Sequence, residues 1–429
     1  MIDLNDLRAR PEVYSAACRA KNIKFDMPAF LALDQEYRTL KSEVENLRAE
    51  QNAFNKELPK LSGEAKTQKL ALMKDLAQQG KDRGALLALK ETEWRALGYK
   101  LPSVPLERVP VGKDDSENVE IRKVGQVLEF DFTPKSHVEL ASELDIIDFE
   151  RGVKVAGARN YFLKGDGARL QRAVLSLALD LLHGKGYTIM DPPIIVSYDA
   201  MLGTGYFPGG EDQAYHLDER DDGFHLIGTA EVPVCAYHTD EIFSLDELPK
   251  KYAGISPCFR REAGTYGKDA QGAYRVHQFY KVEQVVMCAN SVEESARLHA
   301  ELLGNAERLL QLLNIPYRVV DNCTGDMGQG QVYKNDIESW MPSRNGYGET
   351  HSCSTFYEFQ ARRLAIRYKG ADGKNQYCHT LNNTLVASPR ILIPIIELNQ
   401  NSDGTVTIPE ALRPYMGNQE KILKPAAKK

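Results

Sequence analysis

The stretch FRREAGTYGKDAQGAYRVHQFYKVE, residues 259–283, decides the fold that we expect for this chain. It opens with Arg260, Arg261 and Glu262, continues through glycines and small polar residues, and ends in an alternating segment, residues 276–283. This order predicts a strand, a long loop and a second strand, with charged side chains on one face. Arginine beside glutamate suits a site that binds a phosphate and orients the guanidinium group. The alternative is a surface hairpin with a solvated run of charges.

The composition describes an ordinary globular protein that is long enough for two or three domains. The chain has 429 residues, of which 42% are hydrophobic and 27% are charged. It contains no apolar run long enough for a transmembrane helix, and its first residues, MIDLNDLRAR, lack a hydrophobic signal core. We therefore expect a cytoplasmic protein with no membrane association. The net charge of −6 means that any role in nucleic-acid binding needs a local basic surface.

The cysteines indicate neither disulfides nor a zinc site. There are seven of them, an odd number, and they are scattered with no C-x-x-C spacing. This pattern argues against a disulfide framework and against a cysteine-rich metal centre, so no zinc is expected. Cys353 is interpreted as a small buried residue and not as a nucleophile.

The first hundred residues predict a helical arm. One short helix is expected within residues 1–26, followed by a seam with alternating spacings of three and four, which is typical of a coiled coil. The seam consists of Phe30, Leu33, Tyr37, Leu40, Val44, Leu47, Phe54, Leu58 and Leu61. Pro59 and Gly63 interrupt it, and a second helix is expected over residues 65–97, with a weaker seam. The residues of that second seam are Leu70, Met73, Leu76, Leu86 and Leu89.

Two such helices joined by a short turn make an antiparallel arm that is about 45 Å long. Its tip is rich in lysine, and the five lysines concerned are Lys56, Lys60, Lys66, Lys69 and Lys74. A basic tip can bind a phosphate backbone. The alternative is a dimerisation coil, or a spacer whose tip is merely solvated.

Prolines 102 and 105 and the charged residues after them place a domain boundary near residue 105. We expect an arm domain over residues 1–105 and a mixed α and β domain over residues 106–429. The second domain is predicted to contain helices over residues 168–184, 292–313 and 391–399, a strand bent at prolines 192 and 193, and a strand over residues 315–320. The last residues, 424–429, are predicted to be disordered.

Three further stretches carry polar residues suited to ligand binding. GTAEVPV, residues 228–234, offers a hydroxyl and a carboxylate; GETHSCS, residues 348–354, places Glu349 and Ser352 three apart. LNNTLVASPR, residues 381–390, is interpreted as a polar loop that leads to Arg390 at a helix start. No phosphate-binding loop of the Walker type and no dinucleotide-binding glycine motif is present. A nucleotide would therefore need arginine clamps and a metal ion.

At these residues the chain resembles the seryl-tRNA synthetase family of the class II aminoacyl-tRNA synthetases. The resemblance covers nearly the whole chain, because the arm, the linker and three class II motifs follow in the family's order. The motifs match residues 186–193, 259–283 and 381–397. The resemblance implies an α+β fold, with a six- or seven-stranded antiparallel class II sheet flanked by helices and preceded by an N-terminal antiparallel coiled-coil arm. It also implies a homodimer formed through the first motif.

The resemblance implies roles in ATP binding for ten residues. Arg260, Glu262 and Arg390 match catalytic positions: Arg260 bridges the α-phosphate and the amino-acid carboxylate, and Arg390 holds the γ-phosphate. Glu349 and Ser352 match magnesium positions, since a hard cation prefers oxygen ligands. The full ATP-binding set is Arg260, Arg261, Glu262, Val276, Phe279, Glu349, Thr350, His351, Ser352 and Arg390.

The resemblance likewise implies a serine-binding set, which consists of Thr229, Ala230, Glu231, Arg260, Glu283 and Thr384. Serine carries an ammonium and a hydroxyl group, which call for carboxylate and hydroxyl partners. A site built to hydrogen-bond a hydroxyl group rejects alanine strongly, because its own polar groups are then left unpaired.

The implied reaction has two steps. Serine and ATP give seryl-adenylate and pyrophosphate, and the seryl group then passes to tRNA(Ser), with tRNA(Sec) as a second candidate. The arm is expected to bind the tRNA, and residues 264–275 to meet its acceptor end. The rival interpretations are a synthetase-like enzyme with a non-tRNA acceptor, a catalytically inactive RNA-binding or scaffold protein, and an inhibitor-insensitive duplicate.

The sequence departs from the commonest family pattern in three places. Asn382 and Asn383 stand where Asn-Gly is usual, which alters an expected left-handed turn. His351 stands where a small serine is common, and residues 387–389 replace a run that contains glycine. Pro389 is expected to begin the first turn of the helix that follows. Each departure leaves the charged or hydroxyl ligand in place.

Overall fold

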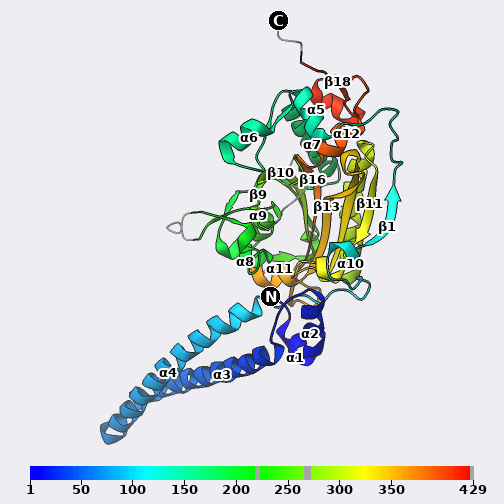
Figure 1. The fold of residues 1–429 in the computed structure, drawn as a ribbon. Helices are drawn as coiled ribbons and strands as arrows, with labels where there is room; N and C mark the ends of the chain where they lie inside the picture. The colour runs from blue at the N-terminus through cyan, green and yellow to red at the C-terminus, as the bar shows by residue number, and fades with distance from the viewer. Residues whose placement is uncertain (218–222, 265–271, 426–429) are drawn as a thin grey trace. The chain divides into compact units, whose positions relative to one another are not determined.

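The computed structural model describes residues 1–217, 223–264 and 272–425. The chain divides into two compact units, Met1–Pro102 and Ser103–Lys429 (Figure 1).

The first unit begins with two short helices where the sequence predicted one. They are α1 (Leu4–Ala9) and α2 (Pro11–Ala20). Asp3 caps α1 by accepting the N–H groups of Asn5 and Asp6. Arg10, with φ −138° and ψ 56°, leaves the helical region, and Pro11 takes the first position of α2. Proline fits there because that position needs no N–H partner, so the chain starts a new helix at residue 11.

The arm is a hairpin of two long helices, α3 (Met27–Glu57) and α4 (Gly63–Gly98), which confirms the predicted coiled-coil arm (Figure 1). Asp26 caps α3 through the N–H of Ala29. The five N-terminal seam residues of α3 are buried, and these are Phe30, Leu33, Tyr37, Leu40 and Val44. A short 3-10 turn, Leu58–Lys60, marks the break that Pro59 predicted.

The seam predicted for α4 is only partly right. Leu76 is buried, but Leu70 is 47%, Leu86 41% and Leu89 71% exposed. Steps of four and three from Leu76 lead instead to Gly80, Gly84 and Leu87, which are half-buried. A Cβ on Gly80 would lie 3.4 Å from Gln51 Nε2 of α3, an ordinary van der Waals distance, so this position faces α3. The two glycines hid the true register, because the neighbouring leucines look more like seam residues.

The second unit is built on an eight-stranded sheet, which confirms the predicted class of fold but has more strands than the six or seven expected. All neighbouring strands are antiparallel except β4 and β9, which are parallel. The spatial order is β1 (Val119–Val124), β11 (Tyr317–Asp321), β12 (Tyr333–Met341), β13 (Gly346–Tyr357), β16 (His379–Ser388), β10 (Gln278–Cys288), β9 (Lys250–Phe259) and β4 (Thr188–Met190).

Two helices cover one face of this sheet: α7 (Asp166–His183) and α10 (Val292–Leu312), both near their predicted bounds. Val282 and Val286 of β10 and Leu385 of β16 pack with these helices in the main hydrophobic core. Successive side chains of a strand point to opposite faces. Lys281 and Glu283, the two neighbours of Val282 in sequence, therefore face the other side, where the cavity opens.

Shorter helices surround the sheet and the open face. They are α5 (His137–Glu143), α6 (Phe149–Ala156), α8 (Tyr198–Thr204), α9 (Glu231–Ala236), α11 (Phe359–Leu364) and α12 (Leu392–Leu398). The α12 helix with Pro394 in its first turns is as predicted, and all its residues are buried. Among the helices of the described residues, none combines the length and the apolar character needed to cross a lipid bilayer.

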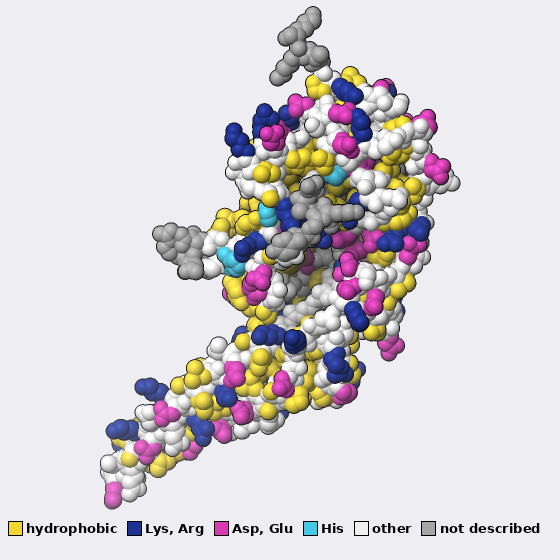
Figure 2. Space-filling model, in the orientation of Figure 1, with side chains coloured by type: hydrophobic (Ala, Val, Ile, Leu, Met, Phe, Trp, Pro, Cys, Tyr) yellow, Lys and Arg dark blue, Asp and Glu magenta, His cyan; other side chains and the backbone are white. Residues whose placement is uncertain are grey.

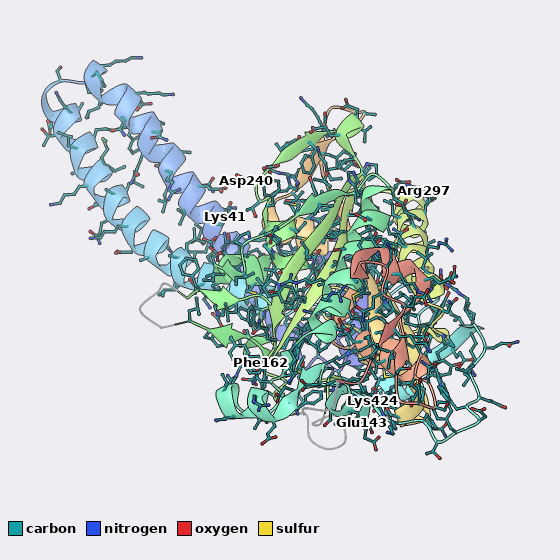
Figure 3. All side chains as sticks on the ribbon, turned by 90° about the horizontal axis from the view of Figure 1, so that it is seen from above. Lys41, Glu143, Phe162, Asp240, Arg297 and Lys424 are labelled. Atoms are coloured by element: carbon teal, nitrogen blue, oxygen red, sulfur yellow. The ribbon has the colours of Figure 1, made fainter. Side chains whose placement is uncertain are left out.

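Within the described residues, four small sheets complete the unit. In two of them the central strand pairs with both neighbours: β7 (His225–Leu226) lies between β5 (Ile195–Val196) and β6 (Tyr215–His216), and β14 (Arg367–Lys369) lies between β15 (Asn375–Tyr377) and β8 (Ile242–Ser244). The other two are pairs, β2 (Ile147–Asp148) with β3 (Phe162–Leu163) and β17 (Val406–Thr407) with β18 (Lys421–Ile422). Lys424 lies beside Glu143 of α5, with Nζ 3.3 Å from the carboxylate (Figure 3). Of the tail predicted to be disordered, residues 426–429 lie outside the described residues.

Candidate active site

A cavity of about 320 Å³ opens on the uncovered face of the sheet. Its walls come from β10, β13 and β16, from the residues on either side of the loop between β9 and β10, and from Gly328–Gln331. Eleven of the predicted site residues line it, and these are Glu231, Arg260, Glu262, Val276, Phe279, Glu283, Glu349, Thr350, Ser352, Thr384 and Arg390. Stretches that are far apart in sequence thus meet around one cavity.

The stretch 259–283 is a strand, a loop and a strand, but its loop is longer than predicted. β9 ends at Phe259, whose partner is Gln278 at the start of β10. Arg260, Glu262 and Val276 therefore lie beyond the strands, on the two arms of the loop. Glu262 has φ +49°, in the left-handed region, which ends any regular extended pairing there. Of the loop predicted to meet tRNA, residues 265–271 lie outside the described residues.

Arg260 presents a guanidinium group to the cavity. Its Nε donates to Gly228 O at 3.3 Å, and its Cζ lies 5.3 Å from the centre of the Phe279 ring. Burial acts to lower the pKa of Arg260, but Tyr206 and the carboxylates of Glu262 and Glu349 raise it, and the net shift is upward. The charge is therefore permanent, as a group that binds phosphate and carboxylate requires.

The arginine partner of Glu262 is not Arg260, its neighbour in sequence. Arg275 Nη1 lies 3.3 Å from Glu262 Oε2, and Arg159 Nη1 donates to the backbone oxygen of Glu262 at 2.9 Å. These contacts hold the two arms of the loop together. Arg261 does not line the cavity; its side chain is exposed and its N–H donates to Gln213 O.

Two buried carboxylates, Glu231 and Glu283, face one end of the cavity. Glu283 forms an ion pair with Lys281 and accepts from Thr384 Oγ1 at 3.4 Å. Among the described residues, the side chains that donate to Glu231 are both neutral: Tyr206 OH at 3.0 Å and Gln360 Nε2 at 2.7 Å. Burial, together with the nearby charge of Glu283, raises the pKa of Glu231 to about 7. An ammonium group placed here would find an acceptor that forms no ion pair within that part of the chain.

Thr229 and Ala230, both predicted to contact serine, do not line the cavity. Thr229 is fully buried and its Oγ1 accepts the N–H of Glu231 at 3.2 Å. Ala230 packs in a core cluster with Val234 and Val285. Both residues fix the start of α9, and so the place from which the Glu231 side chain projects.

A β-bulge lets Glu349 and Ser352 line the same cavity. Residues three apart on a regular strand point to opposite faces. In β13, however, Glu349 pairs with Glu338 while His351 pairs with Ile337, so Thr350 is an extra residue. The bulge returns Glu349 to the side of Ser352. Sequence spacing alone does not contain this information.

Charges of both signs surround Glu349, whose side chain is 46% exposed. Arg390 donates through Nη1 to Glu349 O at 3.1 Å, and the same Nη1 lies 3.7 Å from Glu349 Oε2. Burial acts to raise the pKa of Glu349, but Arg390, Lys334 and Arg260 lower it, and the net direction is downward. The carboxylate therefore stays ionised beside Ser352.

His351 and Cys353 lie on the helix-covered face of β13. His351 is 1% exposed, its Nδ1 contacts Thr350 Oγ1 at 2.8 Å, and burial lowers its pKa to about 4. It does not line the cavity, although it was predicted to bind ATP. Cys353 is buried, as predicted, and burial raises the pKa of its thiol.

The residues at 382–389 that differ from the commonest family pattern lie in or directly after strand β16, and not in a loop. Asn382 and Asn383 lie inside β16, and neither has a positive φ, so the expected left-handed turn is absent. Asn382 lines the cavity, and Asn383 donates to Leu302 O at 2.7 Å on the other face. The helix begins at Leu392, so Pro389 precedes it instead of forming its first turn.

Comparison with known proteins agrees with this geometry. The family model for the class II tRNA synthetase core domain (G, H, P, S and T) matches residues 215–399, and that for the seryl-tRNA synthetase N-terminal domain matches residues 1–105. The serine–tRNA ligase of Deinococcus radiodurans is 45% identical over 425 residues, which cover 99% of this chain and 100% of that protein.

The chain belongs to the seryl-tRNA synthetase family. Two solved structures from this family are similar along their whole length. The seryl-tRNA synthetase of Pyrococcus horikoshii, complexed with ATP, has a TM-score of 0.89 and 37% identity, over 99% of this chain and 100% of that one. The cytoplasmic serine–tRNA ligase of Naegleria fowleri, complexed with AMP, has a TM-score of 0.83 and 31% identity, over 97% and 96% of the two chains.

The residue-by-residue assignment from this family missed several polar residues around the cavity. Lys281 could have been found, since it alternates with Phe279 and Glu283 on one face of a strand. Tyr206 and Gln360 could not, because they reach Glu231 from segments with no recognisable motif. Asp336 pairs across the sheet with Ser352 and forms an ion pair with Lys334 at 3.1 Å.

Proposed function

We propose that this member of the seryl-tRNA synthetase family activates serine with ATP and transfers the seryl group to tRNA(Ser). One observation carries the proposal. The same cavity is lined by Arg260, by the two carboxylates Glu231 and Glu283, and by Glu349 and Arg390. In the first step, a carboxylate oxygen of serine attacks the α-phosphorus of ATP and pyrophosphate leaves. In the second, a ribose hydroxyl of the tRNA attacks the carbonyl carbon and AMP leaves.

Arg260 is the central catalytic residue of this proposal. Negative charge moves onto the oxygens around the α-phosphorus as the carboxylate attacks, and a half-buried guanidinium held in place by Gly228 O stabilises that charge without having to reorganise. Glu262 and Arg275 brace the loop that carries Arg260. Glu231 and Glu283 receive the ammonium and hydroxyl groups of serine, with Thr384 as a further hydroxyl partner.

The nucleotide is proposed to lie between Phe279 and Arg390. Phe279 offers a ring on which adenine can stack, with Val276 beside it. Arg390 is held by Tyr274 O, which accepts from its Nε at 3.0 Å, and its guanidinium lies 4.4 Å from the Tyr274 ring. A rigid cation at this end of the cavity suits the γ-phosphate.

Magnesium is the metal that the oxygen groups near Glu349 fit. Within the described ranges, no group of three or more His, Cys, Asp or Glu side chains is arranged to hold a metal ion. Magnesium needs fewer protein ligands, because it keeps several waters and binds phosphate oxygens. Glu349 and Ser352 would hold it, and the bound ion would neutralise charge on the phosphates.

The arm is proposed to bind tRNA through its tip. Lysine and arginine side chains are distributed along it among acidic ones (Figure 2). Lys56, Lys60, Lys66 and Lys74 are exposed, whereas Lys69 lies 2.8 Å from Glu57 and 3.4 Å from the centre of the Phe54 ring. Scattered lysines on a helical rod suit recognition of shape and backbone instead of bases. The same contacts would serve tRNA(Sec) if it shares that shape.

A homodimer and a cytosolic location complete the proposal. Ile189 lies on β4, an edge strand within the first motif, and is 44% exposed; Ile195 on β5 and Phe162 on β3 (Figure 3) are 48% and 47% exposed. An edge strand and exposed apolar side chains suit an interface. All seven cysteines are unpaired, as suits a reducing compartment.

The test is serine-dependent exchange between ATP and pyrophosphate, followed by tRNA charging. Arg260→Ala is expected to reduce exchange at least about 10²- to 10³-fold, because it removes the main stabiliser of the transition state. Arg261→Ala is the matched variant: the neighbouring arginine does not line the cavity, so a loss below about threefold is expected. Normal exchange in Arg260→Ala would remove the central assignment. Exchange without tRNA charging in the wild type would favour a non-tRNA acceptor.

A further inference from the structure

Gln360 lies behind the cavity and not in its wall. It is the second residue of α11, and its side chain is 1% exposed. Its Nε2 donates to Glu231 Oε1 at 2.7 Å and to Thr204 O at 3.0 Å. We infer that Gln360 is a positioning residue, which fixes the Glu231 carboxylate in the orientation that receives the ammonium group of the amino-acid substrate. The inference rests on the proposed function.

The orientation of the Gln360 amide follows from its surroundings. Its Oε1 accepts from Thr380 Oγ1 at 2.6 Å and from Cys235 Sγ at 3.8 Å. If the amide were turned over, its NH₂ would donate to the Thr380 hydroxyl, but its carbonyl oxygen would meet both Thr204 O and the Glu231 carboxylate. The two oxygen–oxygen contacts are repulsive, so only the orientation with Nε2 towards Glu231 satisfies all partners. Gln360 therefore always donates to the carboxylate.

The network ties Glu231 to three other parts of the fold. Thr204 ends α8, Cys235 lies on α9 one turn after Glu231, and Thr380 lies on β16. All three residues that contact Gln360 are buried. Because every amide group is engaged, the Gln360 side chain has one position, and so does the carboxylate oxygen that it holds.

The two donors to Glu231 are neutral, and over residues 1–217, 223–264 and 272–425 no cation forms an ion pair with its carboxylate. The charged and titratable groups that face it are Glu283 and Lys281 from β10, Tyr206 after α8, Cys235 within α9 and Arg260 after β9. Lys281 is engaged by Glu283 and Arg260 donates to Gly228 O. The ammonium group of the substrate is then the cation that completes the site, provided that Glu231 is ionised and correctly turned.

The experiment replaces Gln360 by methionine, which has similar length but no amide. Exchange kinetics are measured for serine and for ATP, across pH. Gln360→Met is expected to raise KM for serine about tenfold to a hundredfold, as for the loss of a hydrogen bond to a charged group, and to leave KM for ATP within twofold. The acid limb of kcat/KM for serine is expected to move to higher pH, because the ionised form of Glu231 loses a donor.

Gln284→Met is the matched control. Gln284 is also fully buried, and its amide donates to Leu302 O and accepts from Asn305, away from the cavity. It is expected to lower the melting temperature as Gln360→Met does, but to leave KM for serine and the pH profile unchanged. If both variants change KM for serine and ATP alike, or if Gln360→Met changes neither, the inference is wrong.

Thr380→Val gives a second test that needs less change to the core. It removes the hydroxyl group that donates to Gln360 Oε1, and is expected to raise KM for serine about threefold, with the same sign of shift in the pH profile. An unchanged KM for serine in Thr380→Val would contradict the claim that the contacts of Gln360 with the fold position Glu231. Absence of serine-dependent exchange in the wild type would instead overturn the proposed function, which keeps the two failures distinct.

Discussion

Asp34 in the first unit and Glu231 in the second are both buried carboxylates at helix junctions, but their partners differ. Asp34 on α3 accepts from Arg8 Nε and Nη2, each at 2.8 Å, and from Trp94 Nε1 at 3.0 Å. It thereby joins α1, α3 and α4. The side chains that donate to Glu231, in the part of the chain that the structure describes, are the hydroxyl of Tyr206 and the amide of Gln360.

The partners move the two acids in opposite directions. Burial acts to raise the pKa of Asp34, but the hydrogen bonds from Arg8 and Trp94 lower it, and the net direction is downward. Burial and Glu283 raise the pKa of Glu231 to about 7. The charge of Asp34 is neutralised inside the fold, whereas that of Glu231 stays available to a ligand. One carboxylate holds helices together, and the other is suited to binding and proton-dependent chemistry.

The largest effect is expected from shortening the arm, which should affect tRNA charging but not the exchange reaction. Glu43 and Arg83 face each other across α3 and α4, so the arm can be shortened by replacing residues 45–81 with a short glycine-serine turn. Charging of tRNA is expected to fall at least about 10³-fold, since all the tip lysines are lost. Exchange between ATP and pyrophosphate is expected to stay within twofold, because the cavity belongs wholly to the other unit.

The retained base provides the control for this variant. Asp34, Arg8 and Trp94 all remain, so a normal melting profile is expected for the shortened protein. Undiminished tRNA charging would show that the arm has another role, such as that of a spacer.

The arm could be predicted from sequence to the extent that its contacts repeat along the chain. The seam of α3 follows from spacing alone, because one face of a helix recurs every three or four residues. The register of α4 was missed, since Gly80 and Gly84 carry no side chain to mark the seam. The cap at Asp3 and the proline at position 11 could have shown that two helices precede the arm.

The site could be predicted only in part, for a different reason. The resemblance supplied Arg260, Glu283 and Arg390, which line the cavity. Which residues of 349–354 face it depends on the bulge at Thr350, and a bulge is set by pairing with β12 and not by local sequence. Gln360 is fixed through contacts with segments more than 100 residues away along the chain, and no local pattern records such contacts.

A smaller effect tests the charge of Glu231 by pH. The ionised carboxylate binds an ammonium group and the protonated acid does not, so kcat/KM for serine should fall as pH falls through about 7. Between pH 8 and pH 6 the ionised fraction of a group with this pKa drops about tenfold, and kcat/KM should follow it. The measurement is serine-dependent exchange at saturating ATP.

Asp34→Asn serves as the control for this pH dependence. The pKa of Asp34 is lowered, so this acid is ionised throughout the range from pH 6 to pH 8. Its replacement should therefore leave the pH dependence of kcat/KM for serine unchanged. The variant should instead destabilise the first unit, because Arg8 loses its partner. A flat profile between pH 6 and pH 8 in the wild type would mean that Glu231 is not the group that receives the ammonium.

The smallest expected effect distinguishes lysines within the arm by whether their charge is already engaged. Lys66 and Lys74 are exposed, whereas Lys69 pairs with Glu57 and lies over the Phe54 ring. Lys66→Ala and Lys74→Ala should each raise KM for tRNA severalfold and reduce the slope of log(kcat/KM) against log salt by about 0.7 to 0.9, as expected for one lost phosphate contact. Lys69→Ala should change the slope less, because its charge is partly offset within the arm. An equal loss for all three would mean that the Glu57 pair opens when tRNA binds, and Glu57→Gln would then strengthen binding.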